Sequence, residues 1–396
     1  MKVNTEISAV EEVLTRGVQE IVVADSLKKK MLSGKQLRIK HGVDPTSTDL
    51  HLGYAVVYEK LRQFQELGHK IVFLIGSFTA RFGDPTDKGK VREMKTKEAV
   101  MEMAKEYIKQ LGKIIDIKKI EVVYNGNWYD KFSAEDLLNL MSKFTVARML
   151  ERDMFQQRMK EAREIYLHEP VYPVLQGYDS VVIKSDITVI GSDQKFNELQ
   201  ARPLQEAAGQ VPQDLMMVPL LIGTDGEQKM SQSLGNYIGI ADSPQDQFGK
   251  TMSIPDSLIY SYFELCTRVD ASDLYEIEKQ LKSGENPRNI KVRLAKEIVK
   301  IYHGERAAQK AEEEFINVFS NKQKPTNIPK FVFREDMNIL GIMVASEMVT
   351  SNSEGRRMVE QKAVKVNEII VSDIEQHGFK AGDVVQVGKR RYIELV

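Results

Sequence analysis

The first part of the chain alternates between two spacings of apolar residues. Residues 37–44 (LRIKHGVD) predict a strand, and residues 71–76 (IVFLIG) form a continuous apolar run, as in strands that are buried on both faces. Between them, four apolar side chains repeat at helical spacing ahead of the helix-ending Gly68: Val57, Leu61, Phe64 and Leu67. Strand, helix and strand in this order predict a βαβ unit.

The same alternation returns further along the chain. Residues 185–193 (SDITVIGSD) and 216–223 (MMVPLLIG) each predict a strand that leads into a polar loop, and three stretches have helical spacing: residues 6–32, 91–112 and 134–163. This order predicts an α/β fold with a Rossmann-like, doubly wound parallel sheet. Ligands of such sheets bind beyond the carboxyl ends of the strands. We therefore expect the chemistry in the loops after Val43, Gly76, Ile190 and Ile222.

Strand patterns stop near residue 244. Residues beyond it have helical spacing up to about 319, and the polar segment SNKQKPTNIP predicts a linker. The tail combines two short helical stretches with two expected hairpins, AVKVNEIIVS and GDVVQVGKRRYIEL. The expected domains are an α/β domain over 1–224, a loop and helical domain over 225–319, a linker over 320–333 and a small α+β domain over 334–396.

Composition narrows the class of protein. Hydrophobic residues make up 42% and charged residues 29% of the 396 residues, which is ordinary for a soluble globular protein. The 56 Lys plus Arg are balanced by 57 Asp plus Glu, so a polyanion could bind only at a local basic patch. The single cysteine, Cys266, excludes a disulfide framework and a cysteine-based metal site, and its apolar surroundings predict a buried thiol. Residues 1–21 lack the apolar core of a signal peptide, and no stretch is apolar over membrane length. We therefore expect a cytosolic protein.

The segment HGVDPTSTDLHLGY, residues 41–54, joins the first predicted strand to the following helix. Free amides at a helix N-terminus suit an anion, and Gly53 allows a close approach of a nucleotide to the backbone. His51, Thr46 and Ser47 are further hydrogen-bond donors. An alternative interpretation remains open: Asp44, Pro45 and Asp49 also serve as ordinary turn and cap residues.

A second polar segment, DGEQKMSQSLGNYI at 225–238, follows another predicted strand. Lys229 supplies a compact positive charge, and Ser231 and Ser233 supply hydroxyl groups. Such a set of donors suits a phosphorus centre that gains negative charge during reaction. The alternative is a solvated loop without a chemical role. Two such segments in one chain, each just beyond a predicted strand, favour the functional interpretation.

HLGY resembles the HIGH signature, and KMSQS the KMSKS signature, of class I aminoacyl-tRNA synthetases. Four further segments narrow the resemblance to bacterial tyrosyl-tRNA synthetases: DPTSTDLHLGY, GDPTDKGKVR (83–92), YPVLQGYDS (172–180) and GSDQKFN (191–197). The tail resembles the S4 RNA-binding domain through SEGRRMVEQKAVKVN and AGDVVQVGKRRYIEL. The resemblance extends over nearly the whole chain.

The resemblance implies that tyrosine is activated with ATP to tyrosyl-adenylate and is then transferred to the 3′ end of tRNA. The residues implied at the reacting phosphates are Thr46, His51, Lys88, Arg92, Lys229, Ser231 and Ser233. ATP would contact Gly42, Asp44, His51, Gly53, Tyr54, Gly191, Asp193, Gln194, Lys229, Met230 and Gln232. Tyrosine would contact Lys40, Asp84, Tyr172, Gln176, Asp179 and Gln194. Asp84 would hold the ammonium group, with Tyr172 and Gln176 beside it, and Asp179 would accept from the phenol. Magnesium would accompany ATP without a dedicated protein site, and no organic cofactor is expected.

Three residues depart from the family pattern. Tyr54 stands where the first signature usually ends in His, and Gln232 removes a positive charge from the second, which predicts slower activation. Lys40 stands where many members have a tyrosine that reads the substrate hydroxyl. A buried lysine there either donates to the phenol or pairs with Asp179 or another carboxylate. Two alternatives follow: a related synthetase for another aromatic amino acid, or a weakly catalytic paralogue that binds RNA or regulates.

The implied RNA contacts lie in the tail. From Arg334 to Val396 nine basic residues face ten acidic ones, so only a local cluster can bind RNA: Arg356, Arg357, Lys362, Lys365, Lys389, Arg390 and Arg391. A solvated charged surface is the alternative interpretation. The resemblance also implies a homodimer with an interface near 127–160, and tRNA that spans both subunits.

Overall fold

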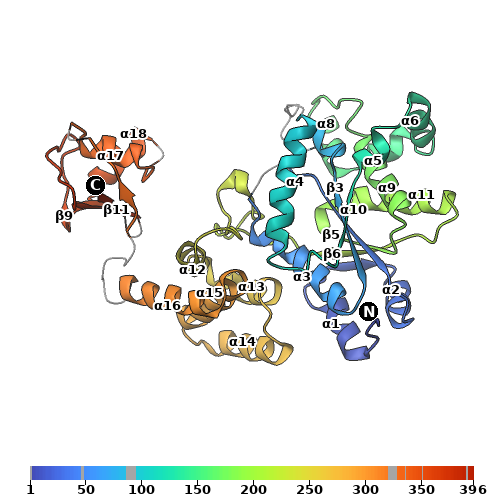
Figure 1. The fold of residues 1–396 in the computed structure, drawn as a ribbon, viewed down its shortest axis with the longest axis horizontal. Coiled ribbons are helices and arrows are strands. Elements are labelled where there is room, and N and C mark those ends of the chain that lie inside the picture. The colour runs from blue at the N-terminus through green and yellow to red at the C-terminus, as the bar shows by residue number, and fades with distance from the viewer. Residues whose placement is uncertain are drawn as a thin grey trace. The chain divides into compact units, whose positions relative to one another are not determined.

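The computed structural model describes residues 2–45, 49–85, 95–319, 328–334, 336–349, 351–388 and 391–396, without the side chains of 318 and 319 (Figure 1). The contacts divide the chain into two units, Met1–Glu312 and Glu313–Val396. The first unit holds both the large sheet and the helices that follow it. The expected division near 224 and the linker over 320–333 therefore stay predictions, and most of that linker lies outside the described residues.

A six-stranded sheet forms the centre of the first unit, in the order β1-β6-β5-β2-β3-β4. The strands are β1 (Glu20–Val22), β2 (Arg38–Val43), β3 (Lys70–Ile75), β4 (Glu121–Tyr124), β5 (Ile187–Gly191) and β6 (Asp214–Val218). All neighbours are parallel except β1, which runs antiparallel to β6. The predicted doubly wound sheet is confirmed. Its order reverses between β2 and β5, which is where a ligand crevice forms in such sheets.

Three details of the predicted strands and of the helix at the start of the chain were wrong. Residues 6–32 are not continuously helical, because β1 separates α1 (Ile7–Thr15) from α2 (Ala24–Leu32). The three-residue β1 is too short to show a period of its own. β4 was not predicted, since only its short EVVY run marks it. The strand expected over 216–223 ends at Val218, because Pro219 has no amide hydrogen for the ladder.

Alternating side chains of β3 show how both faces of the sheet are covered. Ile71, Phe73 and Ile75 belong to the main core, which also includes residues of α3 (Leu52–Glu66) and α4 (Lys97–Leu111). Val72 and Leu74 pack on the other face against Ile183, at the end of α9 (Tyr172–Ile183). Helices on both faces explain why the IVFLI run is apolar at every position.

Shorter elements complete this region of the first unit. They are η1 (Thr79–Arg81), α5 (Gly126–Tyr129), α6 (Ala134–Met141), α7 (Val146–Met149), α8 (Asp153–Lys160), η2 (Ser192–Gln194), α10 (Lys195–Leu199), α11 (Ala201–Ala207) and η3 (Gln232–Leu234). The helix expected over 134–163 is thus broken into three. Ser133 and Thr145 cap the starts of α6 and α7 with their side chains, which accept from backbone amides.

The helices predicted after residue 244 are present. They are α12 (Pro244–Met252), η4 (Asp256–Leu258), α13 (Ile259–Cys266), α14 (Ala271–Ser283), α15 (Pro287–His303) and α16 (Glu305–Phe319). Cys266 is buried in the main core as predicted, and burial raises the pKa of its thiol far above the usual value. No helix in the described part of the chain is both long and apolar enough to cross a bilayer.

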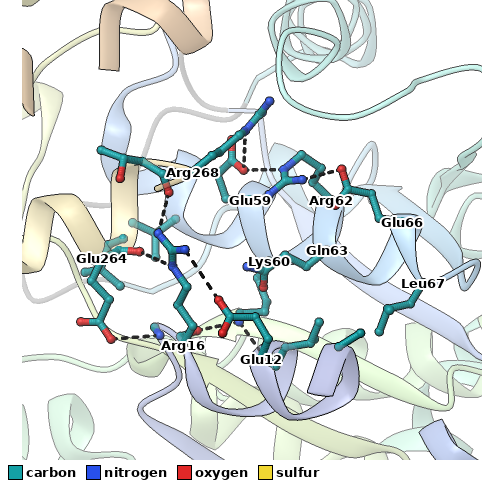
Figure 2. Close-up of a pocket in the computed structure, with 16 residues that line it drawn as sticks. Glu12, Arg16, Glu59, Lys60, Arg62, Gln63, Glu66, Leu67, Glu264 and Arg268 are labelled. Carbon is teal, nitrogen blue, oxygen red and sulfur yellow. Dashed lines mark hydrogen bonds and ion pairs between the residues drawn. The ribbon is translucent and has the colours of Figure 1, made fainter. Parts of the chain in front are cut away.

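Two cations, the partly buried Arg16 and the buried Lys60, tie α1, α3 and α13 together around a cavity of about 270 Å³ (Figure 2). The Arg16 guanidinium donates to carbonyl oxygens at the end of α13, including those of Glu264 and Thr267. The Lys60 ammonium of α3 donates to the carbonyl oxygens of Val13 (2.9 Å) and Arg16 (2.6 Å) at the end of α1. Burial lowers the pKa of Lys60 to about 7. Both cations thereby satisfy carbonyl groups that a helix end leaves unpaired.

The second unit is a small α+β body. Its five strands lie in the order β7-β11-β10-β8-β9 and are β7 (Lys330–Phe331), β8 (Val364–Val366), β9 (Ile369–Ile370), β10 (Val384–Val387) and β11 (Arg391–Leu395). α17 (Ile339–Ala345) and α18 (Asn352–Glu360) contribute to its own core. The two predicted helices and the two hairpins, β8–β9 and β10–β11, are present.

Candidate functional site

A cavity of about 650 Å³ lies at the carboxyl ends of β2, β3 and β5, where the strand order reverses. Every described residue that the sequence analysis placed at ATP or tyrosine lines it: Lys40, Gly42, Asp44, His51, Gly53, Tyr54, Asp84, Tyr172, Gln176, Asp179, Gly191, Asp193, Gln194, Lys229, Met230, Ser231, Gln232 and Ser233. Thr46, Ser47, Lys88 and Arg92 lie outside the described residues. The fold thus brings residues from five parts of the chain to one site.

His51 is the N-cap of α3, and its environment fixes how the imidazole is protonated. Its Nδ1 accepts a hydrogen bond from the Gly53 amide at 3.1 Å, and burial lowers the pKa of His51 to about 4. With Nδ1 as acceptor in a neutral ring, the proton sits on Nε2. A Cβ on Gly53 would lie 2.9 Å from this ring, so the glycine is required for the close fit. The ring is therefore a neutral hydrogen-bond donor.

The KMSQS segment lies against the first signature. Just after the KMSQS segment, the amides of Leu52 and Ile240 donate to the carbonyl oxygens of Ile238 and Leu50, which pairs residues 238–240 with residues 50–52 as a short β-bridge. The Gln232 side-chain amide donates to the carbonyl oxygen of Asp49. Gln232 thus lacks the positive charge of the lysine in the family pattern, but its side chain provides a hydrogen bond between the segments 225–238 and 41–54.

The charged and hydroxyl groups of the second signature are already engaged with neighbours. The Lys229 ammonium pairs with the Asp193 carboxylate at 3.1 Å, and both side chains are about half exposed. The Ser231 and Ser233 hydroxyls lie 3.0 Å apart. Because the Lys229–Asp193 pair is exposed to water, it holds Lys229 in place only weakly. Separating the two charges therefore costs little free energy.

Asp179 on α9 is a buried carboxylate in the wall of the cavity. It is only 2% exposed and accepts from the Trp128 indole at 3.1 Å and from the Asn125 amide at 3.3 Å. Burial raises its pKa to about 7, against the opposing charge of Lys40. A buried carboxylate with two fixed donors still has acceptor capacity for a ligand group. Asn125 and Trp128 were missed by the sequence analysis, since no motif marks them.

Lys40 is fully buried on β2, and its three N–H groups already have partners. Its Nζ donates to the Glu198 carboxylate at 2.9 and 3.0 Å, to Ser180 Oγ at 2.7 Å and to the Gln176 carbonyl at 3.3 Å. Of the alternatives left open by the sequence, pairing with another carboxylate is the one observed. Glu198 on α10 was not identified from the sequence. The only signal for it was that a buried lysine needs a counter-ion.

Two further carboxylates face the cavity. Asp44 accepts from Thr79 Oγ1 and from the Tyr172 hydroxyl, each at 2.8 Å, so it is more than a turn residue. Asp84 is held by both guanidinium nitrogens of Arg152, at 2.9 and 3.0 Å. Arg152 lies far from Asp84 in sequence and was missed. The described residues contain no group of three His, Cys, Asp or Glu that could hold a metal ion.

The predicted basic cluster of the tail belongs to the second unit. Arg356, Arg357 and Lys362 are exposed on or next to α18, and Lys365 on β8 is half-buried. Arg391 pairs with Glu354 at 3.2 Å. Lys389 and Arg390 lie outside the described residues. The described cations of the cluster thus come from α18, β8 and β11 of one small body.

Comparison with known proteins gives a consistent result. Residues 32–320 match the family described as tRNA synthetases class I (W and Y). The chain is 47% identical to the tyrosine–tRNA ligase of Carboxydothermus hydrogenoformans, over 97% of each chain, and 44% identical to that of Mannheimia succiniciproducens, over 99% of each.

Solved structures share the fold at lower sequence identity. A C-terminally truncated mitochondrial tyrosyl-tRNA synthetase of Aspergillus nidulans matches with a TM-score of 0.65 at 22% identity, over 79% of this chain and 95% of that one. Tyrosyl-tRNA synthetase of Archaeoglobus fulgidus, complexed with L-tyrosine, matches with a TM-score of 0.61 at 23% identity, over 78% of this chain and 100% of that one.

Proposed function

The chain belongs to the class I tRNA synthetases of the tryptophan and tyrosine group, and on that basis we propose that it is a tyrosine–tRNA ligase. In the first step a tyrosine carboxylate oxygen attacks the α-phosphorus of ATP, and the bond to the β-phosphate breaks to release pyrophosphate. In the second step the terminal ribose hydroxyl of tRNA attacks the tyrosyl carbonyl carbon and AMP leaves. The observation that carries the proposal is one cavity whose wall contains both a buried carboxylate, Asp179, and the two signatures.

Tyrosine would bind with its phenol hydroxyl donating to Asp179. Lys40 cannot serve as a second reader of that hydroxyl without giving up a partner, because Glu198, Ser180 and Gln176 occupy its donors. The ammonium group would lie near Asp84, with the Tyr172 hydroxyl and the Gln176 side chain as further acceptors. Phenylalanine has no hydroxyl group to donate to Asp179. It would leave this buried acceptor without a ligand partner, which lowers its affinity relative to tyrosine.

ATP would bind between the two signatures. The neutral His51 donates from Nε2, and Lys229 leaves Asp193 for the phosphates, so that Asp193 becomes free for the ribose. Donors of this kind stabilise negative charge at the transition state without transferring a proton. Thr46, Lys88 and Arg92 would add donors to the phosphates. Magnesium would arrive with ATP as part of the substrate, held mainly by phosphate oxygens and water.

The second unit would bind tRNA as an S4-like domain. Exposed Arg356, Arg357 and Lys362 offer positive charge on one helix and the turn after it, which supports binding to the phosphate backbone. Lys365, Lys389, Arg390 and Arg391 would extend this surface. Such contacts read RNA shape more than sequence and weaken with salt. The protein would charge its tRNA in the cytoplasm, where the charged tRNA would be used in translation.

The protein would act as a homodimer through the region near 127–160. Leu138 and Val146 on α6 and α7 are 65% and 74% exposed, and Leu167 nearby is 93% exposed. Large exposed apolar side chains in one stretch of the chain favour a protein interface. An interface there would lie close to α8, whose first residues follow Arg152 at the proposed tyrosine site.

The test is amino-acid-dependent ATP–pyrophosphate exchange across all twenty amino acids, on the full chain without tRNA. Exchange with tyrosine alone supports the proposal. Exchange with another aromatic amino acid keeps the enzyme class and overturns the tyrosine assignment. No exchange from folded protein that still binds tRNA would leave the weakly catalytic paralogue, which Tyr54 and Gln232 favour.

A further inference from the structure

The Asp84 carboxylate is fully occupied in the free protein. Its Oδ1 accepts from Arg152 at 2.9 Å and from the Asn197 amide at 3.4 Å, and its Oδ2 accepts from Arg152 at 3.0 Å and from the Gln194 amide at 3.3 Å. An ionised carboxylate offers about four lone-pair sites. Asp84 is also neutralised, because Arg152 forms a two-pronged pair with it. The group proposed to hold the substrate ammonium therefore starts with neither a free acceptor nor an uncompensated charge.

The Arg152–Asp84 pair is partly exposed at the cavity, whereas the Lys40–Glu198 pair is sealed from water. Arg152 is the residue just before α8 and is 11% exposed, and Asp84 is 23% exposed and lines the cavity. Among the described residues, the guanidinium of Arg152 has no hydrogen-bond acceptor other than Asp84. A pair so placed can exchange its cation with a ligand, whereas the sealed Lys40–Glu198 pair, at most 1% exposed, cannot.

We propose that Arg152 competes with the substrate ammonium group for Asp84, and thereby limits the affinity for tyrosine and for other ligands that carry an ammonium group. This inference rests on the proposed function. Two cations sharing one carboxylate repel each other, so bound ammonium weakens the Arg152 pair whether or not the guanidinium leaves. A ligand without an ammonium group gains nothing from Asp84, because the Arg152 pair already satisfies it. Arg152 is a positioning residue in this scheme and touches no reacting atom.

The experiment is an equilibrium titration followed by tryptophan fluorescence. Trp128 is the single tryptophan of the sequence, and its indole donates to Asp179 at the proposed phenol site. The ligands are tyrosine, tyramine, which keeps the ammonium but lacks the carboxylate, and 3-(4-hydroxyphenyl)propanoate, which lacks the ammonium. The variants are Arg152→Met, which removes the charge, and Arg152→Lys, which keeps it.

Arg152→Met is expected to tighten tyrosine and tyramine on the order of tenfold, and to leave the propanoate within about twofold. Arg152→Lys should stay near the wild type. Arg38→Met is the matched control, because Arg38 makes an equally two-pronged pair with Glu121, at 3.0 Å for both bonds, at the start of β2 and outside the cavity. It should leave all three affinities unchanged.

Weaker tyrosine binding by Arg152→Met would overturn the inference, since it would mean that Arg152 only orients Asp84. An equal change for all three ligands would also overturn it, because a loosened pocket does not distinguish the ammonium group. Wild-type protein that binds no tyrosine would instead contradict the proposed function. The two failures are therefore distinguishable.

Discussion

The buried Lys40–Glu198 pair gives the sharpest prediction for stability. Its atoms are 2.9 Å apart, and both side chains are at most 1% exposed. At an effective dielectric constant of about 20, two unit charges at this distance attract by about 6 kcal/mol. Most of that attraction is offset by the cost of burying the charges. Removal of one partner leaves the other charged and buried, which typically costs about 3–5 kcal/mol.

We expect Lys40→Met to lower the free energy of unfolding by about 3–5 kcal/mol, and Glu198→Gln by a similar amount. The double variant Lys40→Met/Glu198→Gln should recover most of the loss, because neither charge is then buried alone. Urea denaturation followed by Trp128 fluorescence measures this, since the single tryptophan lies in the first unit and reports its unfolding.

Lys195→Met is the matched control for this experiment. Lys195 pairs with Glu20 at 2.6 Å, but the two side chains are 41% and 47% exposed. Such a pair should contribute less than about 1 kcal/mol. The reasoning is refuted if Lys40→Met costs no more than this control, or if the losses of the two single variants simply add in the double variant.

Three other predictions concern His51, Asp179 and Lys60. His51→Ala should slow pyrophosphate exchange by about 10²–10³-fold, with little change in the affinity for tyrosine. Because the pKa of His51 is about 4, the wild-type rate of exchange should show no titration of His51 between pH 6 and 8. Asp179→Asn should reduce the preference for tyrosine over phenylalanine in exchange by about 10- to 100-fold; an unchanged preference would place the phenol elsewhere. The pKa of Lys60, about 7, lies below its ordinary value, so the unfolded chain binds the extra proton between pH 7 and 10 and stability should rise with pH by up to about 1.4 kcal/mol per unit. Urea denaturation at pH 7, 8 and 9 should show this slope in the wild type and not in Lys60→Met.

The sequence by itself determined the class of fold and the position of the site within it. Apolar spacing located α3 by its helical period, and it located β3 because a strand buried on both faces is apolar at successive positions. Parallel strands then require a ligand site at their carboxyl ends. The two signatures at 51–54 and 229–233 follow β2 and β6 along the chain, and all the described residues predicted at ATP or tyrosine line one cavity.

Only the tertiary structure decided which groups are already paired. Lys40 meets Glu198 and Asp84 meets Arg152 across long separations in sequence, and no local pattern marks either partner. Burial is likewise a property of the assembled fold, and it alone makes His51 neutral and raises the pKa of Asp179. Spacing along a chain reports which residues share a strand or a helix face. Charge pairing depends on distance in space and on exclusion of water, and both are set only when the elements pack.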